Sequence, residues 1–173
     1  MPLFSFEGAS PKVHPTAWIA PTATLVGDVT VEADASVWYG VVLRADFGPV
    51  VIRAGANVQD NSVLHGGPEG CTVGPGATIG HLCVVHGATV GAEAVIGNNA
   101  TIQDGAVIGA RTLIAAGATV PPNTQVDSEV VLLGAAAKRQ LPLTEGARKW
   151  VDGNPKIYQE LARRHRDGSA PVD

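Results

Sequence analysis

Three histidines, His65, His81 and His86, are the side chains of this sequence best suited to act together in chemistry. Neutral imidazoles are good ligands for zinc, and three protein ligands leave a fourth position open for water. Iron(II) or cobalt would accept the same ligands. We therefore expect a metal centre, with zinc as the first choice, provided that the fold brings the three rings together.

A six-residue repeat determines where these side chains point. Steps of six along the second half of the chain meet an aliphatic residue each time: Val84, Val90, Ile96, Ile102, Ile108, Ile114, Val120, Val126 and Leu132. A period of six fits neither an α-helix nor one long strand, but it fits a coil of three short strands and three corners. The sequence therefore predicts an all-β protein, a parallel β-helix with its aliphatic residues inside.

The first half of the chain keeps this period, with two three-residue additions at 45–51 and 66–72 that we expect to be loops leaving a corner. We expect one domain, 1–173, in which the β-helix covers 11–134 and a linker covers 135–143. A C-terminal helical segment follows over 144–167. In this segment Thr144 starts a short helix, and Asn154 caps a second helix that Gly168 ends.

Composition narrows the function further. The net charge is −4 and aromatic residues make up 5% of the chain, so neither a basic stripe nor a stacking surface for nucleic acid is expected. We recognise no signal peptide or membrane span, which favours a cytoplasmic protein. A thin aliphatic coil buries little surface by itself, so self-association is expected. We interpret Cys83 as an apolar filler, and His14 and His165 as structural or solvated residues.

The length of the coil sorts the candidate ligands into two columns. Arg44, His65 and His86 are 21 residues apart, which is one coil of 18 plus a three-residue addition. They should stack at one corner on successive coils, about 4.8 Å apart. Asp60 and His81, also 21 residues apart, should form a second column at the preceding corner, beside Gln59.

These two columns can share one metal ion only between copies of the chain. Five extended residues place His81 on the order of 15 Å from His86, whereas zinc–nitrogen bonds are about 2.0–2.1 Å. The first column of one copy must therefore face the second column of another, and such a contact must close into a ring. Triangular prisms close naturally as three, so we expect a homotrimer. The same contact would bring Arg44 of one copy to Asp60 of the next as a bidentate ion pair.

Several motifs in this order resemble the γ-class carbonic anhydrases: Arg44-Ala-Asp46, Gly55-Ala-Asn57-Val-Gln59-Asp60-Asn61, His65-Gly66, Ile79-Gly80-His81 and His86-Gly87. The resemblance covers nearly the whole chain. It implies a left-handed β-helix and a homotrimer with metal centres at its interfaces. It also implies that His65 and His86 come from one subunit and His81 from its neighbour, and that Arg44 and Asp60 pair across the interface.

The resemblance also assigns supporting roles. Gln59 would hydrogen-bond the water or hydroxide on the metal, and Asp46 and Asn57 would be polar residues that support the site. Tyr158 matches a C-terminal tyrosine that approaches the pocket in some members. Its position in the apolar stripe of the C-terminal helix is an equally good explanation.

The leading hypothesis is reversible hydration of CO2, in which the metal-bound hydroxide attacks CO2. The archetypal family pattern has an acid after Arg-x-Asp for proton export, whereas this chain has Phe47, and Glu69 is the one acid in the loop after His65. The tail looks like the subgroup that contains a phenylacetate-pathway acyl-CoA thioesterase and a carnitine-operon protein. Acyl-CoA thioester hydrolysis at the same metal and a weakly active scaffold protein therefore remain alternatives. Acyl transfer is disfavoured, because such enzymes typically use one histidine base.

Overall fold

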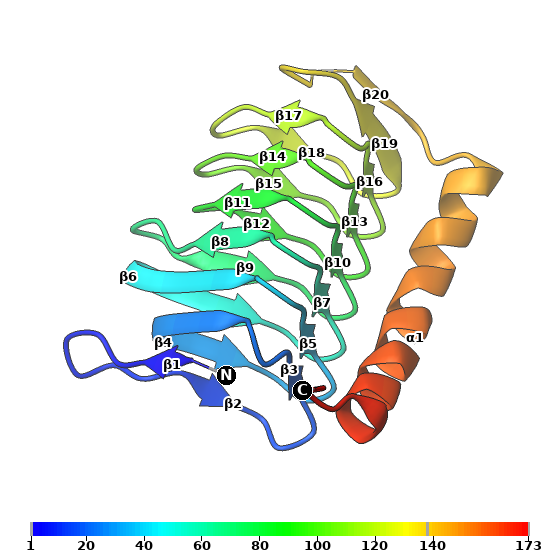
Figure 1. Ribbon diagram of the computed structural model, residues 1–173. Helices are drawn as coiled ribbons and strands as arrows, with labels where there is room; N and C mark the ends of the chain where they lie inside the picture. The colour runs from blue at the N-terminus through cyan, green and yellow to red at the C-terminus, as the bar shows by residue number, and fades with distance from the viewer. Residues whose placement is uncertain (1, 138, 173) are drawn as a thin grey trace.

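The computed structural model, which describes residues 2–137 and 139–172, is a left-handed parallel β-helix of about seven turns with one helix along its side (Figure 1). The predicted fold class is confirmed. Each coil consists of short strands joined by corners. Successive coils pair through parallel backbone hydrogen bonds, so residues one coil apart lie directly above one another.

The strands stack on three faces of a prism. The first face has β3 (Trp18–Ile19), β5 (Ser36–Val37), β7 (Asn57–Val58), β10 (Thr78–Ile79), β13 (Val95–Ile96), β16 (Leu113–Ile114) and β19 (Val130–Leu133). The second has β1 (Leu3–Phe4), β8 (Val63–His65), β11 (Val84–His86), β14 (Thr101–Ile102) and β17 (Thr119–Val120). The third has β2 (Lys12–Val13), β9 (Cys71–Val73), β12 (Thr89–Val90), β15 (Val107–Ile108) and β18 (Gln125–Val126). The long strands β4 (Thr24–Val31) and β6 (Val42–Ile52) pair with both the second and the third face.

Ladders of aliphatic side chains fill the interior. The first face contributes Val37, Val58, Ile79, Ile96, Ile114 and Leu132, all in register. The second contributes Leu25, Leu43, Leu64, Val85, Ile102 and Val120. The third contributes Val31, Ile52, Val73, Val90, Ile108 and Val126. Nearly all are completely buried, so stacking on the coils above and below removes their apolar surface from water.

One position of the predicted series is wrong. Val84 is 40% exposed and its neighbour Val85 is buried in its place. Val85 pairs with Ile102, and this coil is therefore 17 residues long, one fewer than the usual coil. Because neighbouring residues of a strand point to opposite sides, the shortened coil turns Val84 outward.

The two three-residue additions take different forms. The first was expected to be a loop, but it lies inside strand β6, where Gly27 of β4 pairs with Ala45 and Val29 with Val50. The extra residues are thus absorbed as a bulge. The second is a tight turn closed by the pair Gly67 and Gly70. The backbones of these two segments touch, and a Cβ on Gly66 would lie 2.0 Å from the Gly48 carbonyl oxygen, so a side chain cannot fit there.

The C-terminal region differs from its prediction in two respects. The expected linker over 135–143, of which residue 138 lies outside the described residues, contains the strand β20 (Arg139–Pro142), which pairs antiparallel with β19 and covers the end of the coil. The expected pair of helices is one continuous helix, α1 (Glu145–Gly168), capped by the Thr144 hydroxyl. Pro155 lies inside α1 and is buried over Gly76, so packing compensates for the missing backbone hydrogen bond.

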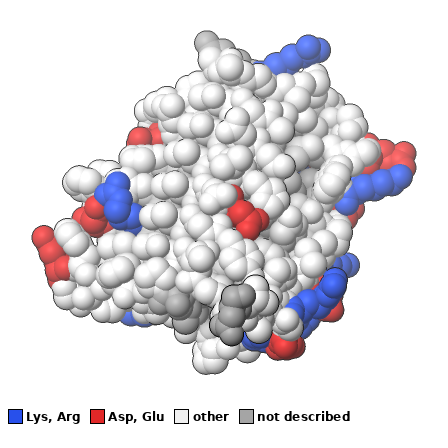
Figure 2. All heavy atoms as spheres, in the orientation of Figure 1, with Lys and Arg blue, Asp and Glu red and all other residues white. Residues whose placement is uncertain are grey.

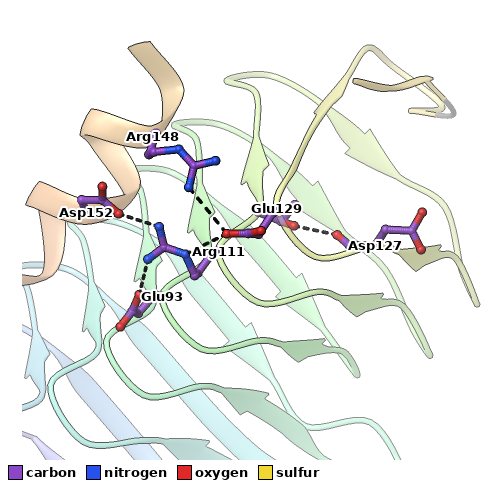
Figure 3. A network of polar contacts seen from close by, with 7 residues as sticks. Glu93, Arg111, Asp127, Glu129, Arg148 and Asp152 are labelled. Atoms are coloured by element: carbon purple, nitrogen blue, oxygen red, sulfur yellow. Dashed lines mark hydrogen bonds and ion pairs between the residues drawn. The ribbon is translucent and has the colours of Figure 1, made fainter. Parts of the chain in front are cut away.

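Helix α1 runs along the first face and contacts β3, β5 and β7 (Figure 1). Its N-terminal half is held by Arg111, which reaches Glu93 and Asp152 at 2.7 Å and Glu129 at 3.3 Å (Figure 3). Glu93, Arg111 and Glu129 occupy the same corner on successive coils, and Asp152 belongs to α1. These carboxylates raise the pKa of Arg111, which therefore stays charged. The network fixes the helix whose side chains border the site described below.

The ladder predicts a sharp contrast between two positions of one coil. Ile102→Ala should lower the free energy of unfolding by about 2–5 kcal/mol, because it leaves a cavity between two coils. Val107→Ala, at a side chain that is 39% exposed, should change it by about 0.5 kcal/mol or less. Urea denaturation of both variants would measure this difference, and equal small losses would contradict the buried ladder.

Candidate metal centre

The first column lies where the coil register predicts it. Arg44 pairs in register with His65, and His65 with His86, on β6, β8 and β11. The two imidazoles face each other, with His65 Nδ1 2.8 Å from His86 Nε2. His65 is buried at 8% exposure, whereas the side chain of His86 is 40% exposed at the rim. Two potential ligand nitrogens therefore converge at the surface of one corner.

Carboxylates determine which ring nitrogens are free. His65 donates from Nε2 to Asp46 Oδ1 at 2.6 Å, and His86 donates from Nδ1 to Asp104 Oδ1 at 2.7 Å. If both rings are neutral, His65 Nδ1 and His86 Nε2, which face each other, each carry a lone pair. Such an arrangement needs a proton or a cation between the lone pairs. A tetrahedral zinc ion would hold two such nitrogens about 3.3 Å apart, so a small ring movement makes room for it.

Asp46 also contacts Arg44 in the same chain. The hydrogen bond from His65, and then the Arg44 guanidinium, hold the pKa of Asp46 below its usual range. This carboxylate is therefore ionised near neutral pH and suited to accept the His65 N–H. Phe47 packs its ring against His65 with 5.8 Å between ring centroids, and its side chain is otherwise 76% exposed.

The second column lies at the preceding corner. His81 Nδ1 lies 2.9 Å from Asp60 Oδ2, and its backbone N–H donates to Asn98 Oδ1 at 3.1 Å. The Nε2 atom of His81 is thus the nitrogen left for a ligand role. The next residue, Leu82, has φ +58° and is 57% exposed. At the same corner of neighbouring coils this left-handed conformation is taken by Gly40, Asn61, Asn99 and Gly117, residues that adopt it readily.

Gln59 and Asn57 form a buried polar chain beside His81. Gln59 donates from Nε2 to Asn57 Oδ1 at 3.0 Å, and Asn57 donates to the Thr78 hydroxyl at 2.9 Å. With its amide nitrogen held in this way, Gln59 keeps its carbonyl oxygen available toward the site. These hydrogen bonds satisfy the two amides, which flank the inward-pointing Val58 and are therefore buried on the outer side of the first face.

A groove of about 490 Å³ opens between this corner and α1, lined by Gln59, His81, Val95, Leu113, Trp150 and Tyr158 among others. Tyr158 also packs edge-on against Trp38, with ring centroids 5.4 Å apart. Burial, and then the negative charge of Asp60, raise the pKa of the Tyr158 hydroxyl, which is therefore neutral near pH 7. The tyrosine thus serves helix packing and borders the groove at the same time.

In residues 2–137 and 139–172 of a single chain, no group of three or more potential ligands could hold a metal ion. His65 and His86 lie together, and His81 lies with Asp60. This separation agrees with a centre divided between copies, although the three-histidine centre itself stays a prediction. The Arg44–Asp60 pair across an interface also stays a prediction, because within one chain Arg44 contacts Asp46 and Asp60 contacts His81.

The remaining candidates lie apart from the centre. Burial raises the pKa of Cys83 to about 11 and that of Cys71 to about 12, so neither is a thiolate at neutral pH. His14 bonds the Thr16 hydroxyl at the surface. His165 packs among aromatic rings and lies 3.1 Å from the Tyr39 hydroxyl. These contacts agree with the structural or solvated roles expected for the two histidines.

Asp104 is the residue of the site that sequence reasoning missed. It lies 18 residues, one full coil, beyond His86. Counting 18 residues forward from each histidine in the sequence would have identified Asp104. The shortened coil between Val85 and Ile102 obscured this relation, because it places Gln103, rather than Asp104, next to His86 along the strand.

Figure 2 shows one side of the molecule, on which Lys and Arg side chains lie near the edges and form no continuous stripe. The residues that the structure describes contain no helix long and apolar enough to cross a membrane.

Comparisons with known proteins agree with the fold and the repeat. Residues 87–122 match the family model "Bacterial transferase hexapeptide (six repeats)". The carnitine operon protein CaiE of Escherichia coli O157:H7 is 38% identical over 165 residues, which cover 95% of this chain and 84% of CaiE. CaiE of Proteus sp. is 37% identical over 97% of this chain and 86% of its own length.

Two solved structures have the same architecture over nearly their whole length. A hexapeptide transferase family protein of Anaplasma phagocytophilum has a TM-score of 0.87 and 35% identity, with 94% of this chain and 96% of that chain covered. A putative acetyltransferase of Bacillus cereus has a TM-score of 0.93 and 30% identity, with 96% and 98% covered. With the repeat, the register and these relatives together, the chain belongs to the CaiE family of γ-carbonic-anhydrase-like hexapeptide-repeat proteins.

Proposed function

We propose that three copies of this chain form a ring with a metal centre at each interface, and that this centre hydrates CO2 reversibly to bicarbonate. The observation on which the proposal rests is that each of the three histidines has a carboxylate partner: Asp46 for His65, Asp60 for His81 and Asp104 for His86. A ligating histidine typically donates its second ring N–H to such a group. Solvated surface histidines have no need of matched partners.

The face between the two columns has the character of a contact surface. Val63, Val84 and Leu82 expose about 40% or more of their surface along this face of the coil. Leu82 also adopts the left-handed conformation, which Gly or Asn adopts at the same corner of the neighbouring coils. An exposed apolar residue in an unfavourable conformation suggests that another surface covers it. A second copy whose His65–His86 column reaches His81 would cover this face.

Zinc suits the imidazole set, and iron(II) or cobalt would also fit. When bound, the ion would supply a Lewis acid that lowers the pKa of a coordinated water toward about 7. Gln59 would orient that water through its carbonyl oxygen, because Asn57 holds its amide nitrogen. Asp46 would keep the Nδ1 lone pair of His65 directed at the centre. Arg44 of one copy would pair with Asp60 of the next and fix the two columns relative to each other.

A second candidate function is hydrolysis of an acyl-CoA thioester at the same centre. The groove beside His81 favours it, because about 490 Å³ with apolar walls at Val95, Leu113 and Trp150 far exceeds the needs of CO2. This volume is typical of sites for larger organic ligands, which measure about 300–1,000 Å³. Tyr158 on the wall of the groove would offer a neutral hydroxyl to a bound carbonyl group. Phe47 stands beside His65, where the archetypal family pattern has an acid for proton export, so the chain lacks a group that would support rapid CO2 hydration there.

The metal centre can be tested with two histidine variants. His81→Ala should abolish stoichiometric zinc binding, because two imidazoles remain at each centre, whereas His14→Ala should bind as wild type does. Metal content after dialysis, measured by mass spectrometry, would check this. Full zinc content in His81→Ala would count against the three-histidine centre.

The division between copies makes a stronger prediction. Homotrimers of His81→Ala and of His86→Ala should each lack complete centres. Equal co-refolding of the two should restore about one quarter of the centres, since that fraction of interfaces combines an intact His65–His86 column with an intact His81. A centre within one chain predicts no restoration, so metal content of the mixed protein distinguishes the two arrangements.

Two assays on the zinc, iron and cobalt forms would separate the candidate reactions. CO2 hydration above the buffer rate by stopped flow supports the leading proposal, and Phe47→Glu should then raise the rate in weak buffer by adding a proton acceptor. Turnover of phenylacetyl-CoA without CO2 hydration would favour the thioesterase. Transfer of an acetyl group to an amine would favour acyl transfer, and a metal-replete protein inactive throughout would favour a scaffold.

A further inference from the structure

We propose that Asp104 is a positioning residue of the metal centre, which holds His86 in the tautomer that leaves Nε2 free for the ion. This inference rests on the metal centre proposed above. Asp104 Oδ1 lies 2.7 Å from His86 Nδ1, while Nε2 of the same ring faces His65. Because the Asp104 carboxylate can only accept, the proton must be on His86 Nδ1, and in the neutral ring the lone pair is then on Nε2.

The fold makes space for this carboxylate. A Cβ on Gly87 would lie 2.4 Å from Asp104 Oδ1, and a Cβ on Gly67 would lie 3.1 Å from it. Gly87 also has φ +53°, and Gly105, which follows the aspartate, has φ +68°. Glycines in the coil below and in the tight turn thus allow the carboxylate to sit directly above the residue that follows His86. A side chain at Gly87 would displace Asp104 from the imidazole.

Other corners of the coil show what is particular about Asp104. In two of them an asparagine carbonyl oxygen occupies the same place above a glycine of positive φ: Asn61 over Gly40 and Asn123 over Gly105. An amide is therefore sufficient to fill this space. Asp104 is the acidic member of the set, and it is the one that contacts the ring of a predicted ligand histidine. Filling the corner does not require a charge, whereas orienting an imidazole N–H benefits from one.

The Asp104–His86 contact affects His86 mainly by fixing the orientation of its ring, rather than by its charge. The side chain of Asp104 is 57% exposed, so solvent weakens its electrostatic effect on the ring. The His65 ring is buried and held by Asp46, but His86 lies at the rim with a side chain that is 40% exposed. Without Asp104, this exposed ring would be free to rotate and to exchange tautomers. A hydrogen-bond partner that fixes the ring orientation is therefore more important for His86 than for His65.

Three variants test the proposal: Asp104→Ala, Asp104→Asn, and Asn123→Ala as the matched control one coil further along. Nitrogen-15 spectra of histidine-labelled, metal-free protein report the tautomer of His86. We expect His86 Nδ1 to carry a proton in wild type, whichever ring holds the proton between His86 Nε2 and His65 Nδ1. Asp104→Ala should lose this preference for a proton on Nδ1, and Asp104→Asn should keep it, because its amide oxygen still accepts.

Zinc affinity, measured by competition with a chelator, is the second readout. Asp104→Ala should weaken binding about 10- to 100-fold, Asp104→Asn should weaken it less, and Asn123→Ala should leave it unchanged. An unchanged tautomer together with wild-type affinity in Asp104→Ala would overturn the proposal, as would equal weakening in Asn123→Ala. If wild-type protein bound no zinc, the metal centre itself would fail, while the metal-free spectra would still decide whether Asp104 orients His86.

Discussion

Stacking of aliphatic side chains inside the coil is the interaction on which the rest of this structure depends. Ile79, Ile96 and Ile114 lie one above another, and each has its apolar surface covered by its neighbours. Because a coil cannot bury that surface alone, every coil must dock in register on the next. Docking in register converts separation along the sequence into position in space. Side chains with no direct bond to the core, such as His65 and His86, are thereby held face to face.

Much of the scaffold could be predicted from the sequence, because the six-residue period reflects this one requirement. The predictions failed where a second influence competed with the period. Val84 satisfies the period, but the shortened coil turns it outward. The bulge in β6 looked like a loop by composition, yet its flanks keep pairing with β4. Asn154 and Pro155 looked like a helix start, but burial of Pro155 against the coil keeps α1 continuous.

The candidate site was predictable to a similar extent and for a related reason. Coil arithmetic places Arg44, His65 and His86 in one column and His81 with Asp60 in another, as the register shows. It does not give hydrogen-bond partners, because a partner can approach from a turn on the next coil, as Asp104 does. Arg44 illustrates the same limit, since its contact within the chain is Asp46, two residues away. Which carboxylate it meets in an assembly depends on a surface that one chain does not contain.

The bulge in β6 and the tight turn after His65 have a consequence for how such a protein can change over time. Both lengthen the chain sideways at a single edge, and the strands above and below keep their partners. Segments of other lengths could be exchanged at this edge without shifting any rung of the ladder. The rim next to the histidines is thus free to acquire new shapes and polarities, while the spacing between the rings is inherited unchanged from the interior.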